Sequence, residues 1–421
     1  MTAGGIARDG RRVSVRLTRD AQRQVRGGHP WVFDASVTGT SHDGAPGDLA
    51  VLFDDKRRFL AIGLWDPASP IRIRVLHRGR PRPIDGAFWH EQLSAAFARR
   101  AGLADLAARG VTTAYRCVHG ENDGLPGLVI DRYDRTWVVR LDTAAWSPHL
   151  PAVLDALRAQ VTALPGDGEA WQGVVLRSGR QARAALAAAG LADGGMLAGD
   201  RPEGPVEFRE NGLLFGADVV RGQKTGHFLD QRHNRARVGA LAGGARVLDV
   251  FSCTGGFTVH AAAGGAAAVH SVDASPHAVA EVAANLRRNH ERPAVATCGA
   301  TAAVGDAFEV LADLGAAGAR YDLVVVDPPS FASKQADMAR AVGAYRRLTT
   351  LALPLLEPGG VLVQSSCSSR VPAEDLFDAV HQAAAGTGRR LHEIERTGHA
   401  EDHPVGFRQG AYLKTLVARV G

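Results

Sequence analysis

The chain has 421 residues, of which 45% are hydrophobic and 22% charged, with a formal net charge of +5 at pH 7. This length exceeds one ordinary core and this composition is typical of globular proteins, so we expect two or three domains. The apolar stretches are too short to cross a bilayer and the first residues lack the apolar core of a secretory signal, which argues against membrane insertion and export. Four scattered cysteines lack metal-ligand spacing, so we expect a reducing cytoplasm, no disulfide framework and no bound metal.

Positive charge is concentrated in the first hundred residues. These hold 17 Lys and Arg against 10 Asp and Glu, a net charge of +7, so the remaining residues sum to −2. A basic N-terminal part on a near-neutral body suits a polyanionic partner such as RNA. An arginine-rich solvated surface would give the same count, so charge alone leaves both interpretations open.

The first domain is predicted over residues 1–80. Four short apolar runs are separated by Gly, Pro and Asp turns, a pattern typical of a small β-barrel. The runs are Val13–Leu17, Leu49–Phe53, Leu60–Leu64 and Ile71–Leu76. The Pro- and Arg-rich segment Arg78–Ile84 indicates a linker.

An α+β domain is predicted over residues 85–203, and its sequence has no evident nucleotide-binding loop. It opens with a helical stretch over Phe88–Arg109 and closes in the turn-rich segment Asp193–Gly204. Between these, we expect strands at Ala114–Val118, Gly127–Asp131, Thr136–Leu141 and Gly173–Arg177, and helices at Leu150–Ala163 and Gln181–Leu191.

The third domain is predicted over residues 205–421. A hairpin-like stretch, Val206–Val220, is followed by strands and helices in alternation. The expected elements are Arg246–Phe251, Ala261–Val272, His277–Arg288, Ala302–Val304, Phe308–Leu314, Leu323–Val326, Ala339–Leu353, Val361–Ser365 and Ala373–Gly386. Such alternation predicts an α/β, doubly wound, Rossmann-like sheet that binds ligands at the carboxyl ends of its strands.

Three successive strand ends of this domain carry residues suited to a nucleotide-like ligand. The first strand ends in Asp249 to Gly256 (DVFSCTGG), where the glycines of the strand-to-helix turn allow close approach of a ligand. This turn is neither G-x-G-x-x-G nor a P-loop. The second strand ends at Asp273, which suits two ribose hydroxyls, and the third at Gly305-Asp306, which suits an adenine amino group. Each signal alone is weak, because a glycine turn often reflects packing, but their order makes them strong together.

The series D-x-F-x-x-x-G-G, strand-end Asp, G-D and D-P-P resembles the motif series of class I methyltransferases. The resemblance implies S-adenosyl-L-methionine as the cofactor. It also implies that Asp273 holds the ribose and Asp306 the adenine. The residues implied around the methionine part are Asp249, Phe251, Gly255 and Gly256.

The fourth and fifth strands predict the reaction site. The fourth delivers Asp327-Pro328-Pro329-Ser330-Phe331, and the two prolines fix a rigid, extended exit that aims Asp327 and Phe331 into the cleft. Phe331 suits stacking of a planar base, and we expect Pro328 to contact the same substrate. The fifth strand ends in Ser366-Cys367-Ser368. In this kind of sheet the first, fourth and fifth strands are neighbours, so Asp249, Asp327 and Cys367 should converge on one edge.

A cysteine at that edge suggests pyrimidine chemistry. Carbon 5 of a pyrimidine is a poor nucleophile until a thiolate adds to carbon 6, and Cys367 is placed for that addition. Asp327 suits the ring N3 and the exocyclic amine of cytosine. A small, buried strand-end cysteine is the alternative, but the serines around Cys367 favour the nucleophile. The sequence does not identify the base that removes the carbon 5 proton.

A second resemblance narrows the family. The segment Gln223–Arg232 (QKTGHFLDQR) resembles the Q-K-T-G-x-F-L-D-Q-R segment of the bacterial 23S rRNA 5-methylcytosine methyltransferases of the large-subunit methyltransferase I type. Gly120–Tyr133 matches a signature of their middle domain, and Gly28–Phe33 resembles the start of their RNA-binding PUA domain. Asp402–Pro404 and Tyr412–Lys414 match their C-terminal end. The resemblance implies 23S rRNA as the partner; no metal or membrane partner is expected, and a homodimer is left open.

Within the Gln223–Arg232 segment, function and structure are equally good interpretations. Gln223 and Thr225 suit the lining of the cofactor pocket, and Phe228 suits packing on the adenine. Lys224 and Arg232 suit binding of a phosphate or of the cofactor carboxylate, although Arg232 is equally suited to a structural ion pair with Asp230.

Four other functions compete with cytosine methylation. Methylation of uracil carbon 5 uses the same cysteine chemistry, but a carboxylate at Asp327 suits the cytosine amine better than a uracil carbonyl. N-methylation of guanine needs no nucleophilic cysteine. A non-catalytic RNA-binding protein would not need Asp249, Asp327 and Cys367 intact. A small-molecule methyltransferase would not need a basic first domain.

Overall fold

The computed structural model describes residues 11–166, 171–332 and 334–421. They form two compact units between which the chain passes several times. The first unit comprises the described part of Met1–Phe208, with Ala217–His227 and Glu401–Phe407. The second comprises Arg209–Gly216, Phe228–Ala400 and Arg408–Gly421. The first unit thus includes two later segments that no pattern in the sequence indicated, and the three predicted domain boundaries stay a prediction.

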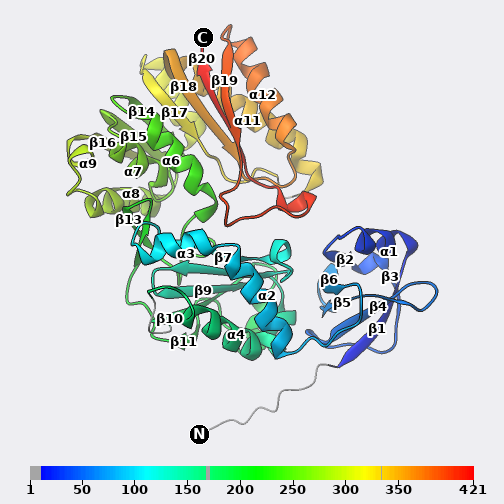
Figure 1. Cartoon of the computed structure of the whole chain (residues 1–421). Coiled ribbons are helices and arrows are strands. Elements are labelled where there is room, and N and C mark those ends of the chain that lie inside the picture. Colours follow the sequence, from blue (N-terminus) through cyan, green and yellow to red (C-terminus); the bar gives the residue numbers. More distant parts are fainter. Residues whose placement is uncertain (1–10, 167–170, 333) are drawn as a thin grey trace. The chain divides into compact units, whose positions relative to one another are not determined.

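A six-stranded sheet opens the first unit (Figure 1). Its order is β2-β6-β5-β4-β1-β3, with one helix, α1 (Arg19–Arg26), after the first strand. The strands are β1 (Arg12–Leu17), β2 (Trp31–Phe33), β3 (Val37–Thr40), β4 (Leu49–Phe53), β5 (Phe59–Trp65) and β6 (Ile71–Arg78). Every second residue of β1 is buried, which places Val13, Val15 and Leu17 in the core. The four predicted runs correspond to β1, β4, β5 and β6, whereas α1 and the short strands β2 and β3 were not predicted.

A five-stranded sheet of order β11-β10-β9-β8-β7 follows in the same unit. Its strands are β7 (Ala114–His119), β8 (Leu128–Tyr133), β9 (Thr136–Leu141), β10 (Gly173–Ser178) and β11 (Met196–Gly199). The helices are α2 (Gly86–Ala98), α3 (Ala101–Ala108), α4 (Leu150–Thr162) and α5 (Arg183–Ala188). The helical stretch predicted over Phe88–Arg109 is present as two helices, α2 and α3, separated by Arg99 and Arg100, and the buried guanidinium of Arg100 binds both oxygens of Asp123. The segment predicted as turns contains β11.

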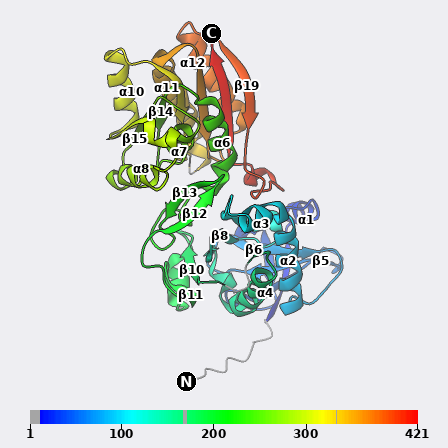
Figure 2. The ribbon, with the colours of Figure 1, turned by 60° about the vertical axis from the view of Figure 1, so that its left-hand side comes forward.

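The predicted doubly wound sheet is confirmed in the second unit. Its seven strands have the order β16-β15-β14-β17-β18-β20-β19, with β20 antiparallel to β18 (Figure 1). In Figure 2 the red C-terminal strand β20 lies beside β19. The strands are β14 (Arg246–Val250), β15 (Ala268–Asp273), β16 (Gly299–Val304), β17 (Tyr321–Val326), β18 (Leu356–Ser366), β19 (Leu391–Thr397) and β20 (Lys414–Val420). The helices are α6 (Arg232–Leu241), α7 (Gly256–Ala263), α8 (Pro276–Arg288), α9 (Pro293–Thr297), α10 (Ala307–Ala316), α11 (Met338–Ala352) and α12 (Ala373–Gly386). The predicted hairpin is the two-stranded pair β12 (Val206–Glu210) and β13 (Leu213–Ala217).

Alternating residues of the central strands enter two separate cores. Leu248 and Val324 belong to the cluster that includes α11 and α12. Their neighbours Val247 and Val325 belong to the cluster that includes α6 and α7. Both faces of the sheet are therefore covered by helices, as a doubly wound fold requires (Figure 1).

One predicted element spans two real ones. Ala261–Val272 was expected as a single element, but α7 ends at Ala263 and β15 begins at Ala268. Gly264 and Gly265 separate them, and Gly265 has a φ of +89°, a conformation that ends a helix and that glycine adopts without strain. The apolar run hid this boundary because alanine and valine continue through it.

Candidate functional site

The turn between β14 and α7 has an unusual backbone. Phe251 and Cys253 have φ angles of 65° and 48°, which non-glycine residues rarely adopt, and Gly255 has 81°. A Cβ on Gly255 would lie 3.1 Å from the Cα of Val282, and one on Gly256 would lie 2.6 Å from Cδ of Arg235. Conformation and packing therefore require both glycines, and their contact with the cofactor stays a prediction.

Asp273, at the end of β15, fastens this turn. Its Oδ2 accepts a hydrogen bond from the backbone N–H of Cys253 at 2.9 Å, and its Oδ1 accepts one from Ser275, also at 2.9 Å. Each carboxylate oxygen retains a further lone-pair site. The arrangement places Asp273 beside the β14 turn, where the predicted ribose contact needs it.

Asp249 is buried and only half satisfied. Its Oδ2 accepts hydrogen bonds from the backbone N–H and the hydroxyl of Thr258, at 3.1 and 2.7 Å. Among the described residues, its Oδ1 has no hydrogen-bond partner, and neither has the hydroxyl of Ser252. Burial raises the pKa of Asp249 to about 6. Buried polar atoms without partners are uncommon, so this pair fits a ligand that supplies a donor or a positive charge.

Asp306 caps a helix. Its Oδ1 accepts hydrogen bonds from the N–H groups of Phe308 and Glu309, at 2.9 and 3.3 Å, at the start of α10. This is the usual role of an aspartate at that position, and it occupies one oxygen of an exposed side chain. The predicted adenine contact is neither required nor opposed by this geometry.

The structure brings together the strand ends that carry Asp249, Asp327 and Cys367. β14 pairs with β17, and β17 pairs with β18, all in parallel. The backbone N–H of Asp327 donates to Val250 at 3.3 Å, and the thiol of Cys367 lies 3.9 Å from the carbonyl oxygen of Pro328. Phe331 follows, half-buried, with its ring 5.2 Å from that of Tyr345 in α11. The predicted convergence at one edge of the sheet is therefore present.

The serines around Cys367 make hydrogen bonds to other residues of the protein. Ser366 donates to the hydroxyl of Tyr345 at 2.8 Å, and its Oγ accepts from the backbone N–H of Ser368 at 3.3 Å. Ser368 in turn donates to the carbonyl of Ala332 at 3.4 Å. These buried hydrogen bonds hold the turn that carries the thiol, so the serines are its support.

Lys414 is the residue at this edge that sequence reasoning missed. It opens β20, pairs with Ser366 across the antiparallel ladder, and is only 5% exposed. Its Nζ donates to the backbone carbonyls of Ser368 and Tyr412. In the sequence, Lys414 was marked only by the match of Tyr412–Lys414 to the C-terminal end of the family, and that match assigned the lysine no chemical role.

The Gln223–Arg232 segment is divided between the two units. Gln223, Lys224 and Thr225 lie in the first unit. Gln223 is exposed and Lys224 has a φ of 52°. Thr225 is fully buried, and its hydroxyl donates to Asp131 at 2.6 Å and lies 3.2 Å from the hydroxyl of Tyr133. These contacts give Thr225 a structural role, and the cofactor contacts of all three residues stay predictions.

Phe228 and Arg232 lie in the second unit. The carbonyl of Phe228 accepts a hydrogen bond from Arg235 at 2.9 Å, and Arg235 also binds Glu210 through two hydrogen bonds of 2.6 Å. Arg232 is 2% exposed at the start of α6. Such burial suits an internal role better than contact with a backbone phosphate outside the unit.

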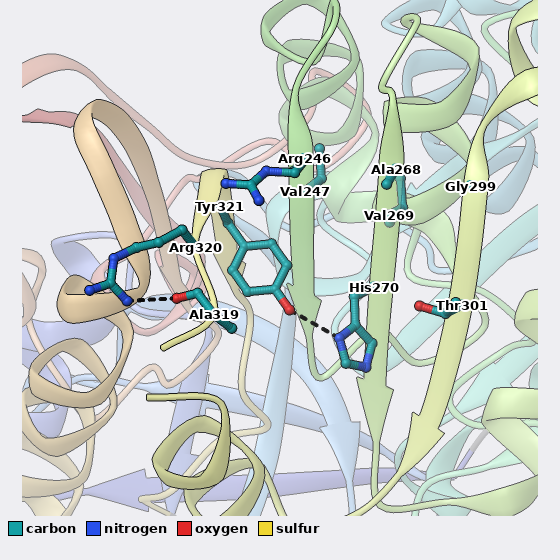
Figure 3. Close-up of a pocket in the computed structure, with 10 residues that line it drawn as sticks. All are labelled: Arg246, Val247, Ala268, Val269, His270, Gly299, Thr301, Ala319, Arg320 and Tyr321. Carbon is teal, nitrogen blue, oxygen red and sulfur yellow. Dashed lines mark hydrogen bonds between the residues drawn. The ribbon is translucent and has the colours of Figure 1, made fainter. Parts of the chain in front are cut away.

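A cavity lies at the opposite end of the same sheet (Figure 3). Its volume is about 240 Å³, and Arg246 and Ala268, the first residues of β14 and β15, help to line it. His270 and Tyr321 approach each other across it, with 3.1 Å between Nδ1 and the hydroxyl. These residues stand at the amino ends of the strands, so the cavity is separate from the edge that carries Asp249 and Cys367.

In the described parts of the chain, no group of His, Cys, Asp and Glu has the arrangement of a metal site. No helix among the described residues has both the length and the apolar character needed to cross a membrane.

Comparisons with known proteins decide the family. Residues 116–419 match the S-adenosylmethionine-dependent methyltransferase family. This chain belongs to that family. S-adenosylmethionine is accordingly the cofactor of this methyltransferase, and the unsatisfied Oδ1 of Asp249 fits such a ligand. Residues 15–78 match the PUA-like domain, which confirms the predicted class of the first sheet.

Two relatives align over almost the whole methyltransferase. A ribosomal RNA large subunit methyltransferase from Deinococcus radiodurans is 45% identical over 406 residues, covering 96% of this chain and 97% of the relative. A ribosomal RNA large subunit methyltransferase I from Shewanella amazonensis is 34% identical, covering 97% and 99%. The methyltransferase belongs to the same family as these proteins.

Solved structures agree on the fold. The crystal structure of SMU.776 complexed with SAH has a TM-score of 0.80 and 20% identity, covering 97% of this chain and all of that one. A proposed S-adenosylmethionine-dependent methyltransferase from Streptococcus mutans has a TM-score of 0.79, also at 20% identity, covering 96% of this chain and 99% of that one. At this identity the likeness establishes the shared fold.

Proposed function

We propose that this methyltransferase methylates carbon 5 of a cytosine in 23S rRNA through a covalent bond between Cys367 and carbon 6. The RNA substrate is supported by the names of the two relatives, by the PUA-like domain and by the net charge of +7 in the first hundred residues. The observation that carries the chemistry is the position of Cys367 beside the Asp327-Pro328 exit, on strands adjacent to the one that ends at Asp249.

The reaction begins at the thiol. The thiolate of Cys367 forms a bond to carbon 6 of the pyrimidine, and the electron pair of the 5,6 double bond moves toward carbon 5 and the ring. The exit at Asp327 and Pro328 holds the base in register with this attack. The carboxylate of Asp327 accepts a hydrogen bond from the exocyclic amine, and in its acid form it donates to N3, which stabilises the charge that the addition places in the ring.

The second half of the reaction restores the base. When bound, S-adenosylmethionine would supply an electrophilic methyl group to carbon 5; the bond from that methyl to the sulfonium sulfur would break, and S-adenosylhomocysteine would be the leaving group. Loss of the carbon 5 proton returns an electron pair to the 5,6 bond, and the bond to sulfur breaks as Cys367 leaves as a thiolate. Phe331 supports the base throughout by contact with its flat face.

The decisive experiment is mass mapping of methylated nucleosides in rRNA. We expect 5-methylcytidine at one 23S position in cells that contain the protein, and its absence in cells that lack it. In vitro, 23S rRNA that contains 5-fluorocytosine should form a denaturation-resistant complex with the native enzyme, because fluorine cannot leave as the proton does. The matched Cys367→Ala variant should form none. If 5-methyluridine or an N-methylguanosine appears instead, the target base is uracil or guanine, and the proposed cytosine target is wrong.

A further inference from the structure

We propose that Lys414 is a positioning residue for Cys367: its buried ammonium group braces the turn over Ser366–Ser368 and favours the thiolate form of the cysteine. The inference rests on the proposed function only in giving that thiolate a reaction to perform. The contacts that carry it all lie within the second unit.

The geometry places Lys414 against both sides of the thiol-bearing turn. Through the backbone ladder it pairs with Ser366, the residue before Cys367. Through its side chain it donates to the carbonyl of Ser368, the residue after Cys367, and to Tyr412 at 3.1 Å. An ammonium group has three donors, and two of them are used in these contacts. A side chain that spans the turn in this way limits the positions open to the sulfur.

The charge of Lys414 acts on the same cysteine. Burial lowers the pKa of Lys414 to about 8, and the negative charge of an ionised Cys367 acts in the opposite direction, raising that pKa. Coupling between two groups is reciprocal, so an ammonium at Lys414 favours the thiolate to the same degree. Below pH 8 the lysine carries its charge, so the effect is present at neutral pH.

The remaining titratable groups near the thiol make such a cation useful. Asp327, when ionised, disfavours a second negative charge beside it. Tyr345 interacts with both Cys367 and Asp327, and burial raises its pKa to about 12, so it stays neutral. A lysine is a strongly hydrated cation that is costly to bury, and two neutral carbonyl oxygens compensate it only in part. A thiolate partner accounts for a cation at this position better than backbone bracing alone.

The first test needs no variant. The rate at which iodoacetamide alkylates each cysteine is measured from pH 5 to 10 in the folded, full-length protein, and peptide mass spectrometry separates the four sites. We expect the midpoint for Cys367 to lie below about 8.5, the usual value for a free thiol. Cys253 is the internal reference, because burial raises its pKa to about 11 and its alkylation rate should therefore still be rising at pH 10. A Cys367 midpoint at or above 8.5 overturns the proposal.

The second test separates charge from bracing. Lys414→Met removes the ammonium but keeps much of the stem, and we expect the pH 7 alkylation rate of Cys367 to fall about tenfold, the effect of one unit in the thiol pKa. Lys414→Arg should recover most of that loss. Arg419→Met is the matched control, since Arg419 is an exposed cation on the same strand that binds the carbonyl of Gly359. Equal pH profiles for the native protein and Lys414→Met, with both folded, overturn the proposal.

The two proposals fail in different ways. If the product is not 5-methylcytidine, or if Cys367→Ala methylates normally, the proposed function is wrong. The alkylation profile then still tests the effect of Lys414 on the thiol of Cys367. If the product is 5-methylcytidine but the alkylation profile of Cys367 is the same in the native protein and in Lys414→Met, the lysine only supports the fold. Should Lys414→Met not fold, the native profile still decides.

Discussion

The carboxyl edge of the seven-stranded sheet in the second unit has two halves that are built differently. In the half proposed to bind the cofactor (the cofactor half), at β14–β16, the carboxylates of Asp249, Asp273 and Asp306 accept hydrogen bonds from backbone N–H groups of the adjoining turn and helix starts. In the half proposed to carry the reaction (the reaction half), at β17, β18 and β20, side-chain hydroxyls and Lys414 hold the turn around the thiol. In the cofactor half, Oδ1 of Asp249 and the hydroxyl of Ser252 have no partner among the described residues, whereas in the reaction half the serine hydroxyls and Lys414 hold the turn that carries the sulfur. Changes in the first should therefore alter affinity, and changes in the second should alter rate.

The largest effect is expected from Cys367→Ala. Removal of the nucleophile should lower the single-turnover methylation rate at least about a thousandfold, because the covalent route is lost. Affinity for S-adenosylhomocysteine, measured by calorimetry, should stay within twofold of native because Cys367 lies outside the cofactor half. Full activity in this variant would contradict the carbon 5 mechanism and, with it, the assignment of different roles to the two halves.

The next effect is expected from Asp273→Ala in the cofactor half. A hydrogen bond to a charged group contributes about 1.5–3 kcal/mol, so affinity for S-adenosylhomocysteine should fall by roughly tenfold to a hundredfold. Saturating cofactor should restore most of the rate. Asp313→Ala, which removes an exposed carboxylate from α10, is the control. Unchanged calorimetric affinity in Asp273→Ala would mean that the ribose is held elsewhere.

A smaller effect is expected from pH through Asp249. Its pKa is raised to about 6, so the carboxylate is ionised above that pH and protonated below it. If Oδ1 receives the ammonium group of the cofactor, affinity should rise as pH increases through 6, by up to about tenfold between pH 5 and 7. Asp249→Asn should flatten this dependence, whereas Asp306→Asn should not. If the affinity of the native protein for the cofactor does not change with pH, Oδ1 of Asp249 does not bind the ammonium group.

The comparison of the two halves also explains what the sequence could reveal. The cofactor half is encoded locally, since Asp249 and Asp273 stand near the ends of successive strands and Gly255 in the turn after the first, and the pattern predicted their places. The reaction half was predicted only where it is local, at Asp327 and Cys367. Lys414 joins that edge through an antiparallel strand pairing late in the chain, which no spacing in the sequence specifies. Similarly, the burial of Thr225 against Asp131 depends on segments far apart in the sequence, so its structural role was not predictable.

The smallest effect tests whether the reaction half is a rigid support. Tyr345→Phe removes the hydroxyl that accepts the hydrogen bond of Ser366, which should lower the free energy of unfolding by about 1 kcal/mol, measured with urea. Tyr321→Phe is the matched control, because its hydroxyl pairs with His270 at the other end of the sheet. Both variants lose a hydroxyl, and Tyr345→Phe should lose more stability because Tyr345 is buried and its hydroxyl also interacts with the backbone of Phe331, whereas Tyr321 is half-buried. Only Tyr345→Phe should also slow methylation, by about twofold to threefold, since it loosens the turn that carries Cys367. Equal rates in the two variants would show that the serine network stabilises the fold without positioning the thiol.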